Sequence, residues 1–249
     1  MQNRYVGDIG DFAKYALLRA IARETKLRIA VIWYLYSDED HNADGRHISY
    51  LRDEALARLD PTLHSALARL IHKRKRSVRS VAAAGILPPD TSFFTNLISD
   101  RRSDTGLSRA QRALFRAAWL KKALASAKDH QLVFLDPDNG LETASVQRHS
   151  PKSGKYVFWN EIAEFWSAGH SLVIYHHLNR TATVARQAEV LKAKFQERFP
   201  DAPLLRHFLA RRGSCRHFWI VAQGQHAQAL AHAIEQISQT ALRECLEVG

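Results

Sequence analysis

Two carboxylates and an amide follow one short apolar run, LVFL, near the middle of the chain. They are Asp136, Asp138 and Asn139, within the stretch QLVFLDPDNGLE. Pro137 pushes Asp136 towards an extended backbone and Gly140 permits a tight reversal, so the local sequence favours fixed side chains. Such acceptors can orient an amine or bind a hard cation. The structural alternative is that Asp138 and Asn139 only cap the next element.

A second polar cluster lies in the N-terminal segment MQNRYVGDIGDFAKY. Asp8, Asp11 and Lys14 stand there around two glycines, next to a helix expected at residues 12–24 that Asp8 or Asp11 caps. This density of polar groups fits a ligand site, and it fits equally well a loop held by its own hydrogen bonds.

A third polar group follows the apolar run RIAVIWYLY at residues 28–36. The loop behind it, SDEDHNADG, contains Asp38, Glu39, Asp40 and Asp44. Because ligands bind at the carboxyl ends of the strands in open α/β sheets, these loops are expected to meet there. The expected pocket is lined by Asp136, Asp138, Asn139, Asp8, Asp11, Lys14 and at least one residue of the 37–44 loop.

Apolar periodicity predicts the elements that position these side chains. Strands buried on both faces are expected at 28–36, 132–135 and 171–177, and a hairpin around Gly213 joins strands at 204–210 and 216–222. Helices are expected at 12–24, 48–59, 61–75, 108–127, 155–166, 181–199 and 226–246. Residues 82–90 are expected to form a turn region, and 92–98 a short strand or helix.

The order of these elements predicts a three-layer α/β fold with a mainly parallel sheet, in which 132–135 is a central strand. A chain of 249 residues with 46% hydrophobic content is long enough for one full core. A single domain over 1–249 is therefore expected, with 60–105 as the candidate for a helical insertion.

The amino-acid composition indicates the cellular compartment of the protein and the class of its partners. Two cysteines are too few for a disulfide framework, which favours a reducing cytoplasm. No apolar stretch has the length of a signal-peptide core or a membrane span, so no membrane partner is expected. The formal net charge of +11 favours a polyanion such as nucleic acid. The candidate contacts are Lys73, Arg74, Lys75 and Arg76, although a charge run of this kind is more often a solvated face.

The element order and several motifs carry a family resemblance. A Rossmann-like sheet whose last two strands form a hairpin resembles that of S-adenosylmethionine-dependent methyltransferases, and LDPDNG resembles the DPPY motif of amino-methyltransferases. YVGDIGDFAKYALL resembles the opening segment of the ribosomal-RNA adenine methyltransferases of the RlmJ type, and FLDP resembles a strand of the three-Cys-motif partner proteins. The resemblance implies a methyltransferase fold and methyl transfer from S-adenosylmethionine to a nucleic-acid amine.

The same resemblance implies roles for individual residues. Asp136 matches the catalytic carboxylate, and Asp138 and Asn139 stand where the DPPY motif has proline and tyrosine. Lys14 matches the lysine of the opening helix, and Tyr15 matches its cofactor-side neighbour. The positional candidates for further contacts to S-adenosylmethionine are Asp38, Asp8 and Asp11. The chain departs from the family after 28–36, where only Gly45 replaces a glycine-rich turn.

Two other functions fit the same fold. The strand-end acids, with His176 or His177, could hold Mg²⁺ or Mn²⁺ in a metal-dependent nuclease or phosphoesterase. Adjacent residues of a strand point to opposite faces, so at most one of these histidines is expected to face the site. The third function is a non-catalytic nucleic-acid-binding module on a methyltransferase scaffold.

Overall fold

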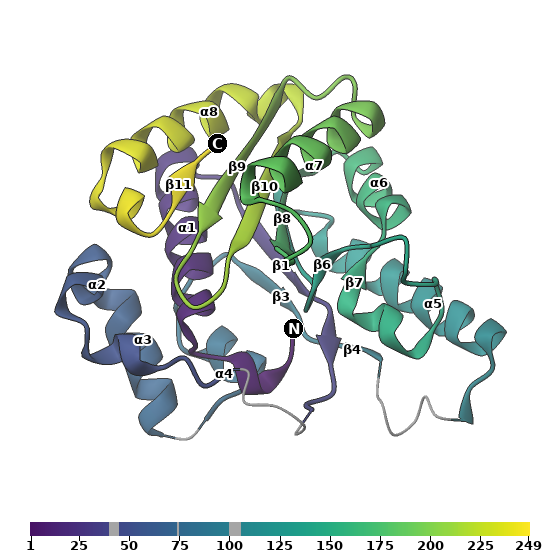
Figure 1. Cartoon of the computed structure of the whole chain (residues 1–249), viewed down its shortest axis with the longest axis horizontal. Coiled ribbons are helices and arrows are strands. Elements are labelled where there is room, and N and C mark those ends of the chain that lie inside the picture. The colour runs from purple at the N-terminus through teal and green to yellow at the C-terminus, as the bar shows by residue number, and fades with distance from the viewer. Residues whose placement is uncertain (40–44, 74, 100–105) are drawn as a thin grey trace.

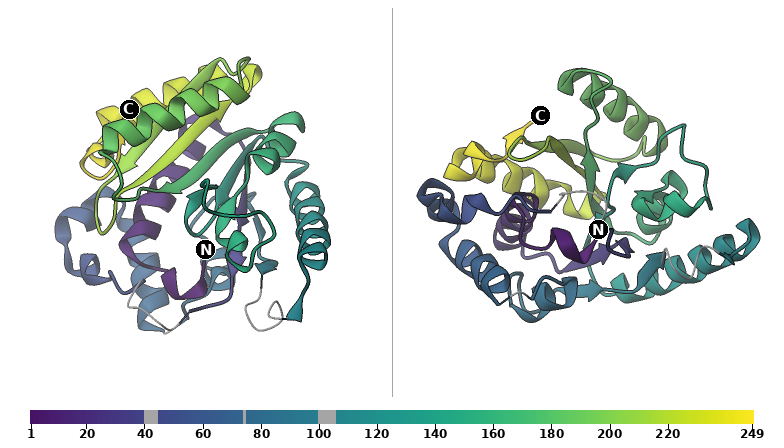
Figure 2. Two further views of the ribbon diagram at one scale, coloured as in Figure 1. Left: turned by 45° about the vertical axis from the view of Figure 1, so that its right-hand side comes forward. Right: turned by 60° about the horizontal axis from the view of Figure 1, so that its bottom comes forward.

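The computed structural model describes residues 1–39, 45–73, 75–99 and 106–249. A seven-stranded, mostly parallel sheet lies between two layers of helices (Figure 1), and Figure 2 gives two further views of these layers. Alternate strand residues serve the two layers: Val31 and Trp33 belong to the core beneath α1 and α8, whereas Ala30 and Ile32 belong to the core beneath α5, α6 and α7. The predicted three-layer α/β architecture is confirmed at this level, and the fold is Rossmann-like.

The sheet has the order β11-β9-β10-β8-β5-β1-β3. Its strands are β1 (Ile29–Trp33), β3 (Ser92–Phe94), β5 (Leu132–Asp136), β8 (Ser171–His177), β9 (Leu204–Ala210), β10 (Arg216–Ala222) and β11 (Glu247–Val248). β5 is central, as predicted, and lies parallel to both β1 and β8, with Asp136 opposite Trp33. β10 is antiparallel to both of its neighbours, β8 and β9, so the predicted hairpin is confirmed.

Eight helices are described, and α1 begins at Ile9, three residues before the expected start. They are α1 (Ile9–Thr25), α2 (Glu54–Leu59), α3 (Pro61–His72), α4 (Val78–Ala83), α5 (Arg109–Ala127), α6 (Trp159–Ser167), α7 (Val184–Arg198) and α8 (Gly224–Gln239). The Asp8 carboxylate caps α1 by accepting hydrogen bonds from the backbone N–H groups of Gly10 and Asp11. None of the described helices is both long enough and apolar enough to cross a bilayer.

Several predicted elements are wrong in their extent. The helix expected at 48–59 is divided, because Asp53 is extended and caps α2 after a 3-10 turn at Ser49–Arg52. The helix expected at 155–166 begins only at Trp159, after the short strand β7 (Tyr156–Val157) pairs with β6 (Gly140–Leu141). The last helix ends at Gln239, since Thr240 turns the chain towards β11.

The middle of the chain contains more than a turn region. α4 occupies the residues just before 84, and β3 adds a strand to the main sheet. A further strand, β4 (Leu97–Ser99), pairs in parallel with β2 (Leu35–Tyr36), which continues the chain beyond β1. The predicted strand at 28–36 is therefore two short strands in two different sheets.

Gly140 closes the segment that follows β5. Its φ is +103°, and a Cβ there would lie 2.7 Å from the His176 Cα atom. We expect Gly140→Ala to lower the free energy of unfolding by about 1–3 kcal/mol more than Gly169→Ala, because both substitutions strain the backbone and only the first also collides with a neighbouring strand. Gly169 is the matched control: its φ is +89°, and a Cβ there meets nothing within 4 Å. Urea titration of the two variants measures the difference, and equal losses would show that the collision is absent.

Candidate functional site

A pocket of about 510 Å³ lies at the carboxyl ends of β5 and β8. The first turn of α1 forms a second side, and the turn between β9 and β10 forms a third. The pocket brings together most of the residues singled out in the sequence, which are Asp8, Asp11, Lys14, Asp136, Asp138 and Asn139. Its size is in the range of small-molecule sites, and its place matches the ligand-binding edge of open α/β sheets.

The Lys14 ammonium joins α1 to β5 at the floor of this pocket. Its Nζ lies 2.7 Å from Asp136 Oδ2 and 2.9 Å from Asp11 Oδ1, and all three side chains are buried. Burial lowers the pKa of Lys14, but the two carboxylates outweigh that effect and hold this pKa well above its usual range. Burial raises the pKa of Asp136, and the charge of Lys14 opposes the rise. Lys14 is therefore charged at neutral pH.

The N-terminal loop is both tied down and part of the pocket. Asp11 Oδ2 accepts a hydrogen bond of 2.9 Å from the Gly7 N–H, while its other oxygen receives Lys14. The Asp8 carboxylate caps α1. The pKa of Asp8 is raised, mainly by burial and to a smaller extent by the nearby Asp11. The N-terminal loop is therefore held by its own hydrogen bonds and also lines the pocket, so the two interpretations left open by the sequence are compatible.

Asp138 is bound to the first residues of the chain. Its Oδ2 accepts a hydrogen bond of 2.8 Å from Gln2 Nε2, and its Oδ1 lies 3.6 Å from the Met1 ammonium. Asn139 is held through its backbone: its N–H donates to the Lys155 carbonyl, and its own carbonyl accepts from the His177 N–H. Among the described contacts, the Asp138 carboxylate serves to fix the N-terminal segment against β5.

Part of the pocket lining is basic and was not anticipated. It carries Arg216, Arg180 and Tyr175, together with Ser214 in the turn between β9 and β10. Arg216 starts β10 and pairs in register with His177 at the end of β8. The signal was present in the predicted hairpin, because a strand antiparallel to β8 must start at the edge where β8 ends.

The two adjacent histidines separate as expected for a strand. His177 lines the pocket, whereas His176 is buried and its Nδ1 accepts a hydrogen bond of 3.1 Å from the Leu141 N–H. Burial, followed by the neighbouring His177, lowers the pKa of His176 to about 4. His176 thus holds β6 against β8 as a neutral side chain.

Other candidate residues lie outside the pocket. Tyr15 of α1 is fully buried in the core and does not line the pocket. Asp38 accepts a hydrogen bond of 3.1 Å from the Arg4 N–H and does not line the pocket. Asp40 and Asp44 lie outside the described residues.

The basic run is divided between surface and structure. Lys73 and Lys75 are exposed, and Arg74 lies outside the described residues. Arg76 is partly buried and donates hydrogen bonds to the carbonyls of Val6 and Gly45, so its guanidinium clamps two loops instead of facing a partner. Arg76 is therefore corrected from a nucleic-acid contact to a structural residue.

The acids of the pocket already have cationic or N–H partners. Across the described ranges, no group of three or more His, Cys, Asp or Glu side chains could hold a metal ion. The Lys14 ammonium lies between Asp11 and Asp136, where a divalent ion would otherwise bridge the two carboxylates.

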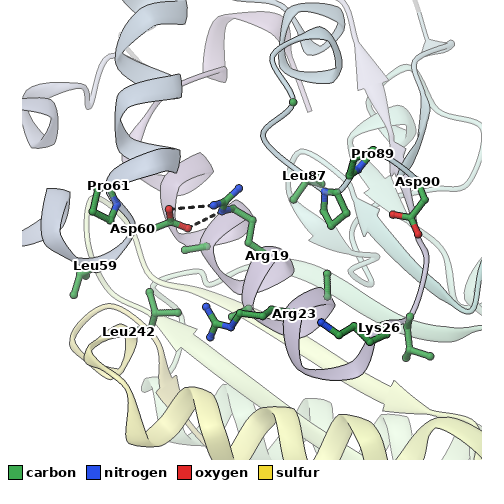
Figure 3. Close-up of a pocket in the computed structure, with 16 residues that line it drawn as sticks. Arg19, Arg23, Lys26, Leu59, Asp60, Pro61, Leu87, Pro89, Asp90 and Leu242 are labelled. Carbon is green, nitrogen blue, oxygen red and sulfur yellow. Dashed lines mark hydrogen bonds and ion pairs between the residues drawn. The ribbon is translucent and has the colours of Figure 1, made fainter.

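A larger cavity of about 750 Å³ lies at the other end of α1 (Figure 3). Arg19 and Asp60 face each other across it, with Arg19 Nε 2.6 Å from Asp60 Oδ2, and Arg19 Nη1 donates to the Ile86 carbonyl. These charged groups satisfy one another, and the cavity is remote from the strand ends that carry the acidic cluster. The smaller pocket is therefore the candidate functional site.

No protein-family model matches the sequence, and no curated protein is significantly similar to it. Arguments about function therefore depend on the geometry of the pocket.

We expect Lys14→Met to lower the free energy of unfolding by about 3–5 kcal/mol, because it leaves two buried carboxylates without their cation. Arg58→Gln is the control: it removes an exposed ion pair in which Arg58 Nη2 lies 3.4 Å from Glu54 Oε2. Its cost should stay below about 1 kcal/mol. Denaturant unfolding of both variants measures the contrast. A Lys14→Met protein as stable as the wild type would show that the carboxylates are not both charged.

His217 makes stability depend on pH. It is fully buried, neither ring nitrogen has a hydrogen-bond partner among the described residues, and burial followed by His207 lowers its pKa to about 3. The unfolded chain then binds more protons between about pH 3 and 6.5, so this contribution to stability is lost as pH falls through that window. From pH 7 to pH 5, the loss from His217 should be about 2 kcal/mol.

Urea titrations at the two pH values test this expectation. The variant His217→Phe should show a smaller drop in stability than the wild type, whereas a variant of the exposed His232, His232→Gln, should not differ from it. Parallel pH profiles for wild type and His217→Phe would contradict the assignment.

Proposed function

We propose that the protein is a methyltransferase-like enzyme whose pocket receives an amine of a nucleic acid or nucleotide at Asp136. The observation that carries the proposal is the state of this carboxylate. It ends the central strand, is 2% exposed, lines the pocket and is fixed through Oδ2 by Lys14 at 2.7 Å. Oδ1 accepts no hydrogen bond from the described residues, which leaves it for a ligand.

A fixed, buried carboxylate suits reactions at an amine nitrogen. Oδ1 of Asp136 can accept an N–H of the amine and so orient the nitrogen lone pair away from the carboxylate. Positive charge that develops on the nitrogen is then stabilised by the negative charge of Asp136, in a site of low dielectric where this effect is large. Lys14 opposes the rise that burial causes in the pKa of Asp136, and it fixes the rotamer of this side chain, so little reorganisation is needed when the amine binds.

The architecture supports the same class of enzyme. The antiparallel β10 lies between β8 and β9, which is the hairpin ending that the resemblance to methyltransferases requires. Arg180 and Arg216 line the pocket, and these two cations support a substrate that carries negative charge.

The end of β1 does not fit S-adenosylmethionine in the manner that the resemblance implies. Tyr36, just beyond β1, donates its backbone N–H to the Met1 carbonyl at 2.9 Å, and the Tyr34 carbonyl accepts from the Met1 ammonium. Gly45 serves a close approach of backbones, since a Cβ there would lie 2.5 Å from the Arg4 carbonyl oxygen. These residues do not form a glycine cradle for the methionine part of the cofactor.

The proposal predicts that methyl incorporation into an adenine-containing oligonucleotide depends on Asp136. Asp136→Asn keeps an acceptor without the charge and should lose about a hundredfold or more in rate, and Asp136→Ala should lose at least as much. Asp129→Asn is the control. It changes an exposed acid that precedes the start of β5, at the end of the strand away from Asp136, and it should retain the wild-type rate. Thermal unfolding of each variant separates loss of activity from loss of fold.

Titration with S-adenosylmethionine and with Mn²⁺ discriminates between the alternatives. Saturable binding of S-adenosylmethionine supports methyl transfer. Absence of that binding, with Mn²⁺ binding that Asp136→Ala abolishes, would replace the proposal with a metal-dependent phosphoesterase.

A further inference from the structure

Arg216 is a buried cation that forms no ion pair with another described residue. It is 5% exposed and lines the pocket, and it makes one hydrogen bond, from Nη2 to Ser214 Oγ at 2.5 Å. Its Nε and Nη1 have no hydrogen-bond partner in the described part of the chain. Unpaired buried donors of this kind are rare in folded proteins, because each has lost its hydrogen bonds to water without gaining one to the protein. Their presence beside a pocket indicates a partner that the chain itself does not supply.

The nearest acid does not supply it. Burial and the nearby Asp11 raise the pKa of Asp8, and Arg216 is close enough to oppose that rise. The Asp8 Oδ1 accepts from the N–H groups of Gly10 and Asp11, and no ion pair between described residues joins Asp8 to the guanidinium. The acids deeper in the pocket are committed to Lys14 and Gln2. The guanidinium of Arg216 therefore has no ion-pair partner among the described residues.

The backbone around Arg216 is shaped to admit the guanidinium. A Cβ at Gly10 would lie 2.5 Å from Nη1, so a larger residue at this position of α1 would displace the side chain. On the other side, Gly213 has a φ of +77°, and a Cβ there would lie 2.6 Å from Ile9 Cγ2. The turn between β9 and β10 is thus pressed against α1, and it carries the Ser214 hydroxyl to the guanidinium.

Arg180 adds a second cation to this wall. It follows β8, lines the same pocket, is exposed and forms no ion pair with any described residue. Two cations and a hydroxyl match the charge and the acceptor oxygens of a phosphate group, which an arginine can bind through two parallel hydrogen bonds.

We propose that Arg216, Arg180 and Ser214 form a phosphate-binding subsite, and that the pocket recognises a ligand by a phosphate on this wall and an amine on the Asp136 wall. The amine half rests on the proposed function, whereas the phosphate half rests only on the contacts and charge of Arg216, Arg180 and Ser214. On binding, a rotation of the guanidinium presents its unpaired N–H groups to the phosphate oxygens.

Calorimetric titration with adenosine monophosphate and with adenosine tests the subsite. The wild type should bind the monophosphate at least about tenfold more tightly, since charge-assisted hydrogen bonds are gained only with the phosphate. Arg216→Gln and Arg180→Gln should each remove most of this preference, and Arg216→Lys should restore part of it. Arg206→Gln, at an exposed arginine of β9 that does not line the pocket, should leave the preference intact.

Equal affinities for the two probes in the wild type, or an unchanged preference in both Arg216→Gln and Arg180→Gln, would overturn the subsite. If Arg216→Gln fails to fold, the exposed Arg180→Gln carries the same test. A short single-stranded oligonucleotide is the third probe. Binding that depends on Arg216 and weakens steeply with salt assigns the phosphate to a polynucleotide, and preference for the monophosphate assigns it to a free nucleotide; both outcomes support the subsite.

The subsite and the proposed function fail separately. Phosphate-dependent binding without any methyl incorporation would remove the methyltransferase proposal and keep the subsite. Methyl incorporation that is unaffected by Arg216→Gln and Arg180→Gln would keep the methyltransferase proposal and remove the subsite.

Discussion

The contact of Lys14 with Asp11 and Asp136 is the interaction on which the site depends. It connects the first turns of α1 to the end of β5 across 122 positions of sequence, in a place from which water is excluded. Burying an ion costs several kcal/mol, and the cost is offset only if the partners are close and correctly oriented. Both distances, 2.7 and 2.9 Å, meet this condition. The contact therefore fixes the position of α1 on the sheet and, with it, the loop that Asp8 and Asp11 organise.

A second buried ion pair fixes the far side of the same strand end. Arg116 of α5 donates from Nε to Glu161 Oε1 at 2.5 Å and from Nη2 to Oε2 at 2.9 Å. The same guanidinium donates to the carbonyls of Ser153 and Tyr156, which precede α6. Because Asn139 is in turn bonded to the Lys155 backbone, the chain after Asp136 is supported from both layers. Such support is what a preorganised site requires, since loose side chains lose most of their electrostatic effect.

Local patterns in the sequence were sufficient to predict the central strand and the first helix, which position this site. The apolar run before Asp136 predicted a central strand, and Asp8 was one of two expected caps for the first helix, because burial on both faces and capping each leave a pattern within a few residues. The surroundings of the buried Tyr15 were not predictable, since the helical pattern shows which residues share a face but not which neighbour covers that face. The role of Arg76 was missed for a related reason. Its acceptors are the backbone carbonyls of Val6 and Gly45, and the types of these residues do not show that their carbonyls bind an arginine.

Strand direction accounts for the two-sided charge of the pocket. Acids gather where parallel strands end and where α1 begins, and the positive end of the helix dipole favours Asp8 and Asp11 there. Arg216 reaches the same edge only because β10 runs against β8; in a wholly parallel sheet the first residue of that strand would lie at the opposite edge. The hairpin thus does more than finish the sheet. It brings a cation from late in the chain to face carboxylates from its beginning and middle, and a ligand must satisfy both.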